Sequence, residues 1–385
     1  MRLRGSISYV KTELCNGRKV TCVGADLVQE VLTGTPNFRA TPFIVPTPCS
    51  YSRRICSNNS TFCLLFNRPP FQTHPGPKQS IRLYVLNRGA KSEYQSEPIQ
   101  SSEISSMRTI TQELRSITIG ERAHFDGLTV FPLFRDGSVP PDGYTLLEEA
   151  IAAGSARVTE VSAGGSVPEL RFENLGEKPV LLLDGEELIG AKQNRVVNLT
   201  ILAPAKQIIV IPVSCVEAGR WDARTADFHP AEHVMYSRAR AAKAAQVSSA
   251  MGTGAGRQSD QSMIWDEIAL KSARLGANSP TQAMKAIYDS SASAMDGYLR
   301  AFVWGEQQVG LVYGIGPEAM GMDLMDNPYM MRAILPKLVR SYALDAVEAP
   351  HSAGVTPVEA AEFLNRIGKA EPLTRPAVVS GRMSG

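Results

Sequence analysis

The sequence lacks the features of membrane proteins and of proteins that follow nucleic acid. It has no run of about 18 or more apolar residues, which a membrane-spanning helix needs, and its start lacks the charged, apolar and small-residue order of a signal peptide. Its formal net charge is +2, whereas proteins that track phosphates usually carry a strong basic excess. We therefore expect a cytoplasmic globular protein that binds neither nucleic acid nor a membrane. Its 385 residues suffice for one large domain or two ordinary ones.

Cysteine is scarce beyond the first part of the chain. Of the 6 cysteines, Cys215 alone follows residue 106. The others recur with equal spacing in two groups, which are Cys15 and Cys22, and Cys49, Cys56 and Cys63. This spacing is wider than the roughly two to four residues between the paired ligands of a zinc knuckle. An odd number of cysteines without a secretory signal also argues against a disulfide framework.

The chain changes in composition near residue 106. The first 106 residues contain 13 Lys and Arg against 6 Asp and Glu, a balance of +7, so the remainder must carry −5 for the chain to total +2. Proline and serine are scattered through this part without helical or strand periodicity. We therefore predict that residues 1–106 are a disordered extension or an upstream segment foreign to the natural protein. A single domain is predicted over residues 107–385, with a plausible start at Met107.

Short apolar segments after Met107 predict a sheet-rich first half. They are rich in β-branched and aliphatic residues, are separated by Gly, Pro, Asn or Asp, and span residues 128–134, 157–161, 169–174, 180–184, 195–202 and 207–213. Most of the connections are too short for the crossover helices that parallel neighbours need. The strands should therefore pair mainly antiparallel, as a sandwich or a partly closed barrel.

Helix signals dominate the second half. Gly276 ends an amphipathic segment where a left-handed cap is expected, and Ser279 with Pro280 has the pattern of a helix start. The predicted helices span 145–154, opened by a capping box of Thr145 and Glu148, then 233–250, 260–275 and 279–302, a segment interrupted by Pro336, and a last segment opened by Thr356. Two further strands are predicted at 309–315 and 319–324. Together these signals predict an α+β fold, with a β-rich first half and helices packed on it.

A dense polar run over residues 184–195 lies between two apolar segments and is the first candidate site. Carboxylates, an ammonium, amides and a guanidinium at close spacing are suited to acid–base chemistry and to stabilising negative charge. The candidate catalytic residues are Glu186, Glu187 and Lys192, and the candidate substrate-binding residues are Gln193, Asn194, Arg195 and, on the following strand, Asn198. The alternative is a closed salt-bridge network in which the two glutamates neutralise the lysine and the arginine.

A second polar run, over residues 212–221, follows the strongest apolar strand, at a strand end where sites are usually built. Arg220 and Trp221 together suit an anionic and planar ligand, because guanidinium forks bind phosphates and an indole ring stacks. Cys215 and Glu217 complete the candidate substrate-binding residues. Cys215 has no histidine nearby in sequence to activate it as a nucleophile, which favours a small buried side chain.

The segment His-Pro-Ala-Glu-His at 229–233 matches the short signature of inverted zinc peptidases. That chemistry needs both histidines on one helical face. Pro230 fits the first turn of a helix and leaves His229 at the cap position, turned away from His233. We therefore predict a helix start with surface histidines and no metal site, with a zinc-dependent hydrolase as a second alternative.

A set of motifs in order along the chain carries a family resemblance. It includes Asp-Gly-Glu-Glu-Leu-Ile-Gly-Ala-Lys-Gln-Asn-Arg at 184–195 and Pro-Val-Ser-Cys-Val-Glu at 212–217, with further motifs at 145–154, 158–161, 166–170, 198–200, 219–221, 259–261, 265–267 and 279–281. Over roughly residues 107–350 the chain resembles the ADP-ribosylglycohydrolase and rhodanese-phosphatase associated protein domain, a bacterial family whose own activity is not established. The resemblance implies a role near NAD or ADP-ribose metabolism.

We therefore predict an enzyme or ligand-binding protein that acts on a phosphorylated nucleotide-type small molecule. The first alternative is a non-catalytic binding or scaffold module whose charged cluster is a structural salt-bridge network. Neither a cofactor nor an oligomeric state follows from the residues.

Overall fold

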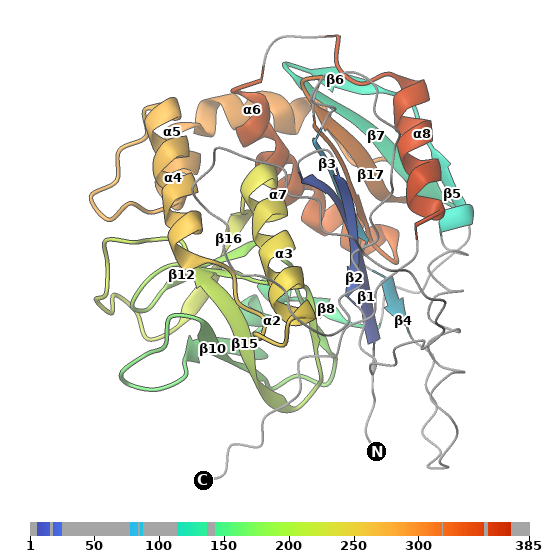
Figure 1. Ribbon diagram of the computed structural model, residues 1–385. Coiled ribbons are helices and arrows are strands. Elements are labelled where there is room, and N and C mark those ends of the chain that lie inside the picture. The colour runs from blue at the N-terminus through green and yellow to red at the C-terminus, as the bar shows by residue number, and fades with distance from the viewer. Residues whose placement is uncertain are drawn as a thin grey trace, which may run out of the picture.

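The computed structural model describes residues 6–15, 18–24, 78–83, 85–87, 114–136, 143–317, 319–349 and 353–370. They form a mixed α+β fold, which confirms the predicted class. Figure 1 shows two groups of strands, one around β10, β12 and β15 and the other around β7 and β17, with helices beside them. Within these described ranges, no helix is long and apolar enough to cross a membrane.

Within the first 106 residues, the structure describes the backbone of four strands. These are β1 (Ser6–Cys15), β2 (Arg18–Gly24), β3 (Lys78–Leu83) and β4 (Val85–Asn87). β1 pairs antiparallel with β2 and β4, and β3 lies parallel to the later strand β18 (Ala319–Leu324). Cys49, Cys56 and Cys63 lie outside the described residues. The predictions for residues 1–106 therefore stay predictions.

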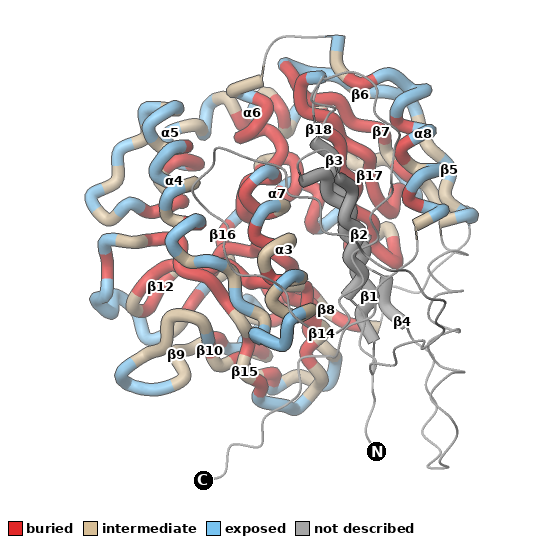
Figure 2. The backbone as a smooth tube through the Cα atoms, in the orientation of Figure 1, coloured by how far each residue is buried: buried red, intermediate tan, exposed pale blue. Residues whose placement is uncertain are grey.

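Six antiparallel strands form a curled sheet in the first half of the domain. In order across the sheet they are β16 (Phe228–Val234), β12 (Glu186–Gly190), β13 (Arg195–Val197), β15 (Gln207–Cys215), β10 (Glu169–Asn174) and β9 (Ala156–Glu160). An isolated bridge between Thr159 in β9 and Asp227, directly before β16, brings the two edges of the sheet together. The sheet is therefore a half-barrel, as the prediction of a partly closed antiparallel barrel requires. Figure 2 shows β12 as largely buried, whereas β9 and β10 alternate between buried and less buried residues.

A smaller sheet continues from the half-barrel. It consists of β8 (Thr145–Leu146), β11 (Val180–Leu182) and β14 (Ile201–Ala203), and α2 (Leu147–Ala152) follows β8 directly. The strand predicted at 195–202 is divided into β13 and β14, which belong to different sheets. The capping box of α2 uses Glu149 rather than the predicted Glu148, because Glu149 Oε2 accepts the hydroxyl of Thr145 at 2.8 Å and the backbone N–H of Leu146 at 3.3 Å.

A second large sheet lies between two helices. Its strands are β3, β18, β17 (Gln308–Ile315), β7 (Leu128–Arg135) and β5 (Ile117–Ile119), with β6 (Ala123–Phe125) also paired to β7. Leu311 and Tyr313 of β17 share a core cluster with α7 (Pro328–Ala346), and Val312 shares another with Phe363 of α8 (Pro357–Gly368). Since strand side chains alternate between faces, the sheet buries both sides. The strands predicted at 309–315 and 319–324 are confirmed.

Four helices follow β16 and precede β17 in the sequence. They are α3 (Ser237–Gly252), α4 (Gln261–Leu275), α5 (Lys285–Ser290) and α6 (Ala292–Ala301). Two of the helices predicted in this region begin at later residues than predicted. The helix predicted from residue 233 starts later, because residues 228–234 form β16. The helix predicted at 279–302 is wrong in its first turn, because the helix begins only at Lys285 and Ser279 Oγ accepts the N–H of Ala283. The rest of the predicted helix is divided at Ser291 into α5 and α6. The end of α4 is confirmed, with Gly276 in the left-handed conformation at φ 64°.

Buried ion pairs fasten α3 to the turn before β12 and to the second large sheet. Lys243 Nζ lies 2.5 Å from Asp184 Oδ1, and the NH2 of Arg240 lies 3.0 Å from Asp323 Oδ1 in β18. All four side chains are buried. The turn before β12 contains Asp184. It is therefore held by α3, whose Lys243 lies 59 residues later in the chain.

Candidate functional site

The two polar runs of the sequence meet beside the half-barrel. β13 pairs with β15 so that Arg195 lies opposite Cys215, and opposite residues of antiparallel strands share one face. The turn before β13 begins at Gly190, where φ is 136° and a Cβ would lie 2.5 Å from the carbonyl oxygen of Asp227. A side chain at Gly190 is therefore excluded, and the tight turn places residues 191–194 beside residues 216–222.

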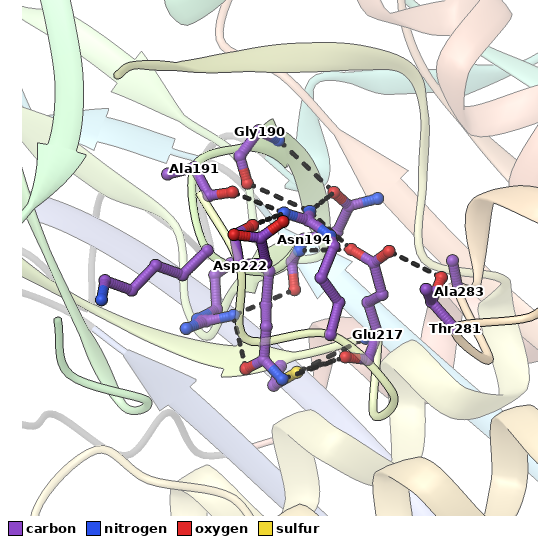
Figure 3. A network of polar contacts seen from close by, with 12 residues as sticks. Gly190, Ala191, Asn194, Glu217, Asp222, Thr281 and Ala283 are labelled. Carbon is purple, nitrogen blue, oxygen red and sulfur yellow. Dashed lines mark hydrogen bonds and ion pairs between the residues drawn. The ribbon is translucent and has the colours of Figure 1, made fainter. Parts of the chain in front are cut away.

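Glu217 is the centre of a buried polar network. Its Oε2 accepts hydrogen bonds from the NH2 of Arg220 at 2.6 Å and from the backbone N–H of Asn194 at 3.0 Å. Its Oε1 accepts the hydroxyl of Thr281 at 2.7 Å, and its backbone carbonyl accepts the amide of Gln193 at 3.1 Å. Figure 3 shows Glu217 between Asn194 and Thr281. The carboxylate is therefore fully engaged by protein groups.

Arg220 holds the turn in place. Besides Glu217, it donates to Asn194 Oδ1 at 3.1 Å and to the backbone carbonyls of Gly190, Ala191 and Asp222. Figure 3 labels Gly190, Ala191 and Asp222, and its dashed lines mark the hydrogen bonds within the network. The fork that the sequence suggested for an anionic ligand thus binds the protein's own oxygen atoms.

A second buried pair continues the network. The side-chain amide of Asn194 donates to Glu187 Oε1 at 3.1 Å, and His233 Nε2 lies 2.6 Å from Glu187 Oε2. The imidazole of His233 stacks on the ring of Tyr288 with a centroid distance of 3.7 Å. Glu187 is 0% and His233 5% exposed. Polar contacts therefore run from His233 through Asn194 to Thr281, and we call these contacts the buried polar network.

Glu186 points away from this network. Its Oε1 accepts the ammonium of Lys337 in α7 at 3.0 Å, and its Oε2 accepts the N–H of Leu183 at 3.2 Å. Neither glutamate of the 184–195 run therefore pairs with Lys192 or Arg195. The alternative of salt bridges between those four residues is therefore not what the structure shows, because β16, α7 and Asn194 supply the partners of the two glutamates.

Asn198 lies beside the second polar run. Its Oδ1 accepts the hydroxyl of Ser214 at 2.6 Å, and its amide donates to the carbonyl of Arg257 at 3.0 Å. Ser214 in turn contacts the hydroxyl of Ser259 at 2.6 Å. Asn198 therefore joins β15 to the segment before α4.

Arg195 is a buried cation whose hydrogen-bonding capacity is only partly used. It is 0% exposed, and its NH1 donates to Gln193 Oε1 at 3.0 Å and to the carbonyl of Asn194 at 3.4 Å. Its Nε and NH2 have no hydrogen-bond partner among the described residues. Burial is the main cause that lowers the pKa of Arg195, while the charges of Cys215 and Glu160 act in the opposite direction.

Trp221 lies over Arg195 and reaches the surface. Trp221 is 47% exposed. Its ring centroid lies 5.6 Å from Arg195 Cζ and 5.4 Å from Lys192 Nζ. Both cations are within reach of the electron-rich ring face. Residues 221–226 are all exposed. An exposed aromatic ring and two cations therefore lie together at the edge of the buried polar network.

Cys215 is a small buried side chain, as the sequence favoured. It is 0% exposed, and burial raises the pKa of its thiol. Gln261 of α4 binds the backbone of Cys215 at both its N–H and its carbonyl, at 2.8 and 2.7 Å. This double contact fastens the end of β15 to the start of α4.

The segment 229–233 is strand β16 and not a helix start. Proline is tolerated there because β16 is an edge strand of the half-barrel. His229 is exposed and lies opposite Ile189, whereas His233 is buried against Glu187, so the predicted pair of surface histidines is wrong at His233. In the part of the chain that the structure describes, no group of three or more His, Cys, Asp and Glu side chains is placed to hold a metal ion.

Two residues of the site were missed in the reasoning from residue types. Thr281 binds Glu217, and Glu160 Oε1 accepts the backbone N–H of Lys192 at 3.4 Å. Both lie in short motifs that carry the family resemblance, at 158–161 and 279–281. A search among those motifs for polar residues far from the two polar runs would have found them.

We expect stability to fall in acid as Glu217 becomes protonated. Burial alone would raise its pKa, but hydrogen bonds from Arg220, Thr281 and the Asn194 backbone outweigh burial and hold the pKa below the ordinary value of 4.5. A depressed carboxyl pKa stabilises the native state above the unfolded pKa, and this contribution is lost as pH falls through the folded pKa. Urea unfolding near neutral pH and at successive values below 4.5 measures the loss.

The acid effect has a matched pair of variants. Glu217→Gln should lose less stability over the same pH range than the wild type, because its side chain no longer titrates. Glu169→Gln, at an exposed position of β10, should follow the wild type. An acid dependence that is equal in the wild type and Glu217→Gln contradicts the assignment.

Comparison with known protein families identifies the family of this chain. The family model ARPP-1, described as the ARG and Rhodanese-Phosphatase-superfamily-associated Protein domain, matches residues 116–384. The matched range contains both polar runs and every residue of the buried polar network. No curated protein and no solved structure matches the chain.

Proposed function

This chain belongs to the ARPP-1 family, the ARG and Rhodanese-Phosphatase-superfamily-associated Protein domain family, and we propose that it binds an anionic, nucleotide-type small molecule. The proposed binding place is formed by Lys192, Arg195 and Trp221, which we call the Arg195 site. The ARG and rhodanese-phosphatase association in the family description supports a phosphorylated or ADP-ribose-like ligand linked to NAD metabolism.

The buried charge of Arg195 carries the proposal. A guanidinium stays protonated in proteins, and moving an ion out of water costs several kcal/mol unless partner groups compensate. Arg195 is 0% exposed, and two of its guanidinium nitrogens lack hydrogen-bond partners within the described ranges. The planar fork of arginine fits two oxygen atoms of a phosphate or a carboxylate. An anionic group at this place would supply the missing acceptors.

Trp221 and Lys192 add the other two properties of a nucleotide site. The half-exposed indole offers a flat apolar face on which a planar ring can stack. The ammonium of Lys192 lies on the same ring and adds a second positive charge for a phosphate. Because Arg195 is 0% exposed and the Trp221 ring lies over its guanidinium, we expect a ligand to reach Arg195 by displacing the indole.

The neighbouring glutamates favour binding over acid–base catalysis. Glu187 is enclosed by His233 and Asn194, and Glu217 by Arg220 and Thr281. A general acid or base must come within hydrogen-bond reach of the group on which it acts. We therefore assign both glutamates to positioning of the 190–195 turn, and Lys192 to charge stabilisation.

Calorimetric titration of the full chain with ADP-ribose and with NAD tests the proposal. We expect wild-type protein to bind at least one of the two. Arg195→Lys should weaken that binding by about tenfold or more, because a lysine ammonium keeps the charge but loses the two-pronged contact. Trp221→Ala should also weaken it, because the stacking surface is lost.

Arg340→Lys is the matched control. Arg340 lies on α7 and pairs with Glu232 of β16, not with a residue of the Arg195 site, so this variant should bind like the wild type. Absence of heat from wild-type protein at millimolar ADP-ribose and NAD overturns the ligand class. Equal affinity of the wild type and Arg195→Lys overturns the place of binding.

A further inference from the structure

Glu160 contributes an unused carboxylate oxygen beside the Arg195 site. Its Oε1 accepts the backbone N–H of Lys192 at 3.4 Å, whereas its Oε2 is buried and has no hydrogen-bond partner in the described part of the chain. The carboxylate therefore lies beside Lys192, one of the three residues of the Arg195 site. The carboxylate does not belong to the buried polar network.

The loop after β9 packs closely against Glu160 and Lys192. Gly165 has a φ of +76°, and a Cβ there would lie 2.9 Å from Lys192 Cδ and 3.2 Å from Glu160 Oε2. A residue with a side chain would be strained in this conformation and would crowd the free oxygen atom. Glycine therefore lets the loop lie close to Glu160 and Lys192.

The Arg195 site thus has unused hydrogen-bonding groups of both kinds. Arg195 Nε and NH2 are donors without acceptors, and Glu160 Oε2 is an acceptor without a donor. An ionised phosphate accepts hydrogen bonds and donates none, so it suits Arg195 and is repelled by Glu160. A hydroxyl group donates and suits Glu160. A ligand that satisfies both residues carries an anionic group and a hydroxyl group close together, as a ribose phosphate does.

We propose that Glu160 Oε2 accepts a hydrogen bond from a ribose hydroxyl of the bound nucleotide and thereby selects ribonucleotides over nucleotides without ribose hydroxyls. This inference rests on the proposed function, because Arg195 must hold the anionic group for the sugar to reach Glu160. It makes Glu160 a specificity-determining residue that the two polar runs do not contain.

Paired titrations with AMP and 2′,3′-dideoxy-AMP test the inference, because the two probes share the base and the phosphate and differ in the hydroxyls. We expect wild-type protein to bind AMP about tenfold or more tightly than the dideoxy nucleotide, as a hydrogen bond to a charged group warrants. Glu160→Gln should reduce this preference to about threefold or less, because the replaced oxygen becomes an amide donor. Glu169→Gln, an exposed control, should keep the wild-type ratio.

The outcomes separate the two proposals. Equal binding of both probes by wild-type protein overturns the role of Glu160 and leaves the nucleotide site standing. Binding of neither probe overturns the site itself, and the inference with it. An unchanged preference in Glu160→Gln, with native thermal stability, assigns the hydroxyl selection to another residue and overturns the inference.

Discussion

Replacing Lys243 with Met is expected to lower the free energy of unfolding by about 3–5 kcal/mol, because the change leaves a buried carboxylate short of its partner. Lys243 Nζ lies 2.5 Å from Asp184 Oδ1 and also donates to the carbonyls of Val197 and Asn198, at 2.8 and 2.9 Å. Lys243 is 1% and Asp184 0% exposed. Met fills a similar volume without donors, so the loss is electrostatic and not a cavity effect. Urea unfolding of the full chain measures it.

Two further variants isolate the cause. Lys285→Met removes a cation from an exposed pair with Asp289 on α5 and should cost about 0.5 kcal/mol or less. The double variant of Lys243→Met with Asp184→Asn should recover part of the lost stability, because the carboxylate that has lost its lysine is then neutral. A loss of about 1 kcal/mol or less for Lys243→Met would show that the buried pair contributes little.

Replacing Arg220 with Ala is expected to cost a similar amount, about 3–5 kcal/mol, because it leaves Glu217 buried and unpaired. The residue is 6% exposed, and its guanidinium is the shared donor for Glu217, Asn194 and the carbonyls of the 190–191 turn. Loss of these contacts also frees the turn that places Lys192 and Arg195. Equilibrium unfolding in urea is the measurement, and ADP-ribose titration of the same variant reports on the site.

Arg340→Ala is the matched control for this change. Arg340 pairs with Glu232, whose side chain is 79% exposed, so its loss should cost about 1 kcal/mol or less. Combining Arg220→Ala with Glu217→Gln should restore part of the stability, since the uncompensated carboxylate is then neutral. Equal stability losses for Arg220→Ala and Arg340→Ala would contradict the role of Arg220 at the centre of the network.

The place of the candidate site followed from the sequence, but the pairing within it did not. Charged residues between apolar strands are unusual enough to mark residues 184–195 and 212–221, and the β13–β15 register brings these two runs together. The hydrogen-bond and ion-pair partners of a buried side chain depend on which strand or helix packs against it. Glu187 contacts His233 of the edge strand β16. Glu186 binds Lys337 of α7, which lies 151 residues later in the chain. The spacing of residues within one polar run cannot predict contacts with such distant parts of the chain.

The same limit explains the error at β16. Residues 228–234 have a proline, two histidines and few β-branched residues, so local propensity favours a helix start. Pairing with β12 overrides that propensity, and the proline is accommodated because one side of an edge strand needs no ladder partner. The strand in turn buries His233, which the sequence placed at the surface.

Local pattern was sufficient for the fold class, for most strands and for the end of α4, because alternation, short connections and a glycine cap act within a few residues. It also marked where the polar residues gather. The bonding state of each polar side chain was settled by long-range packing, since burial and the nearest charge depend on the whole fold. That is why Glu187, Glu217 and Arg220, all chosen as ligand-facing residues, are engaged inside the protein, and why Arg195 and the unforeseen Glu160 retain unused polar atoms.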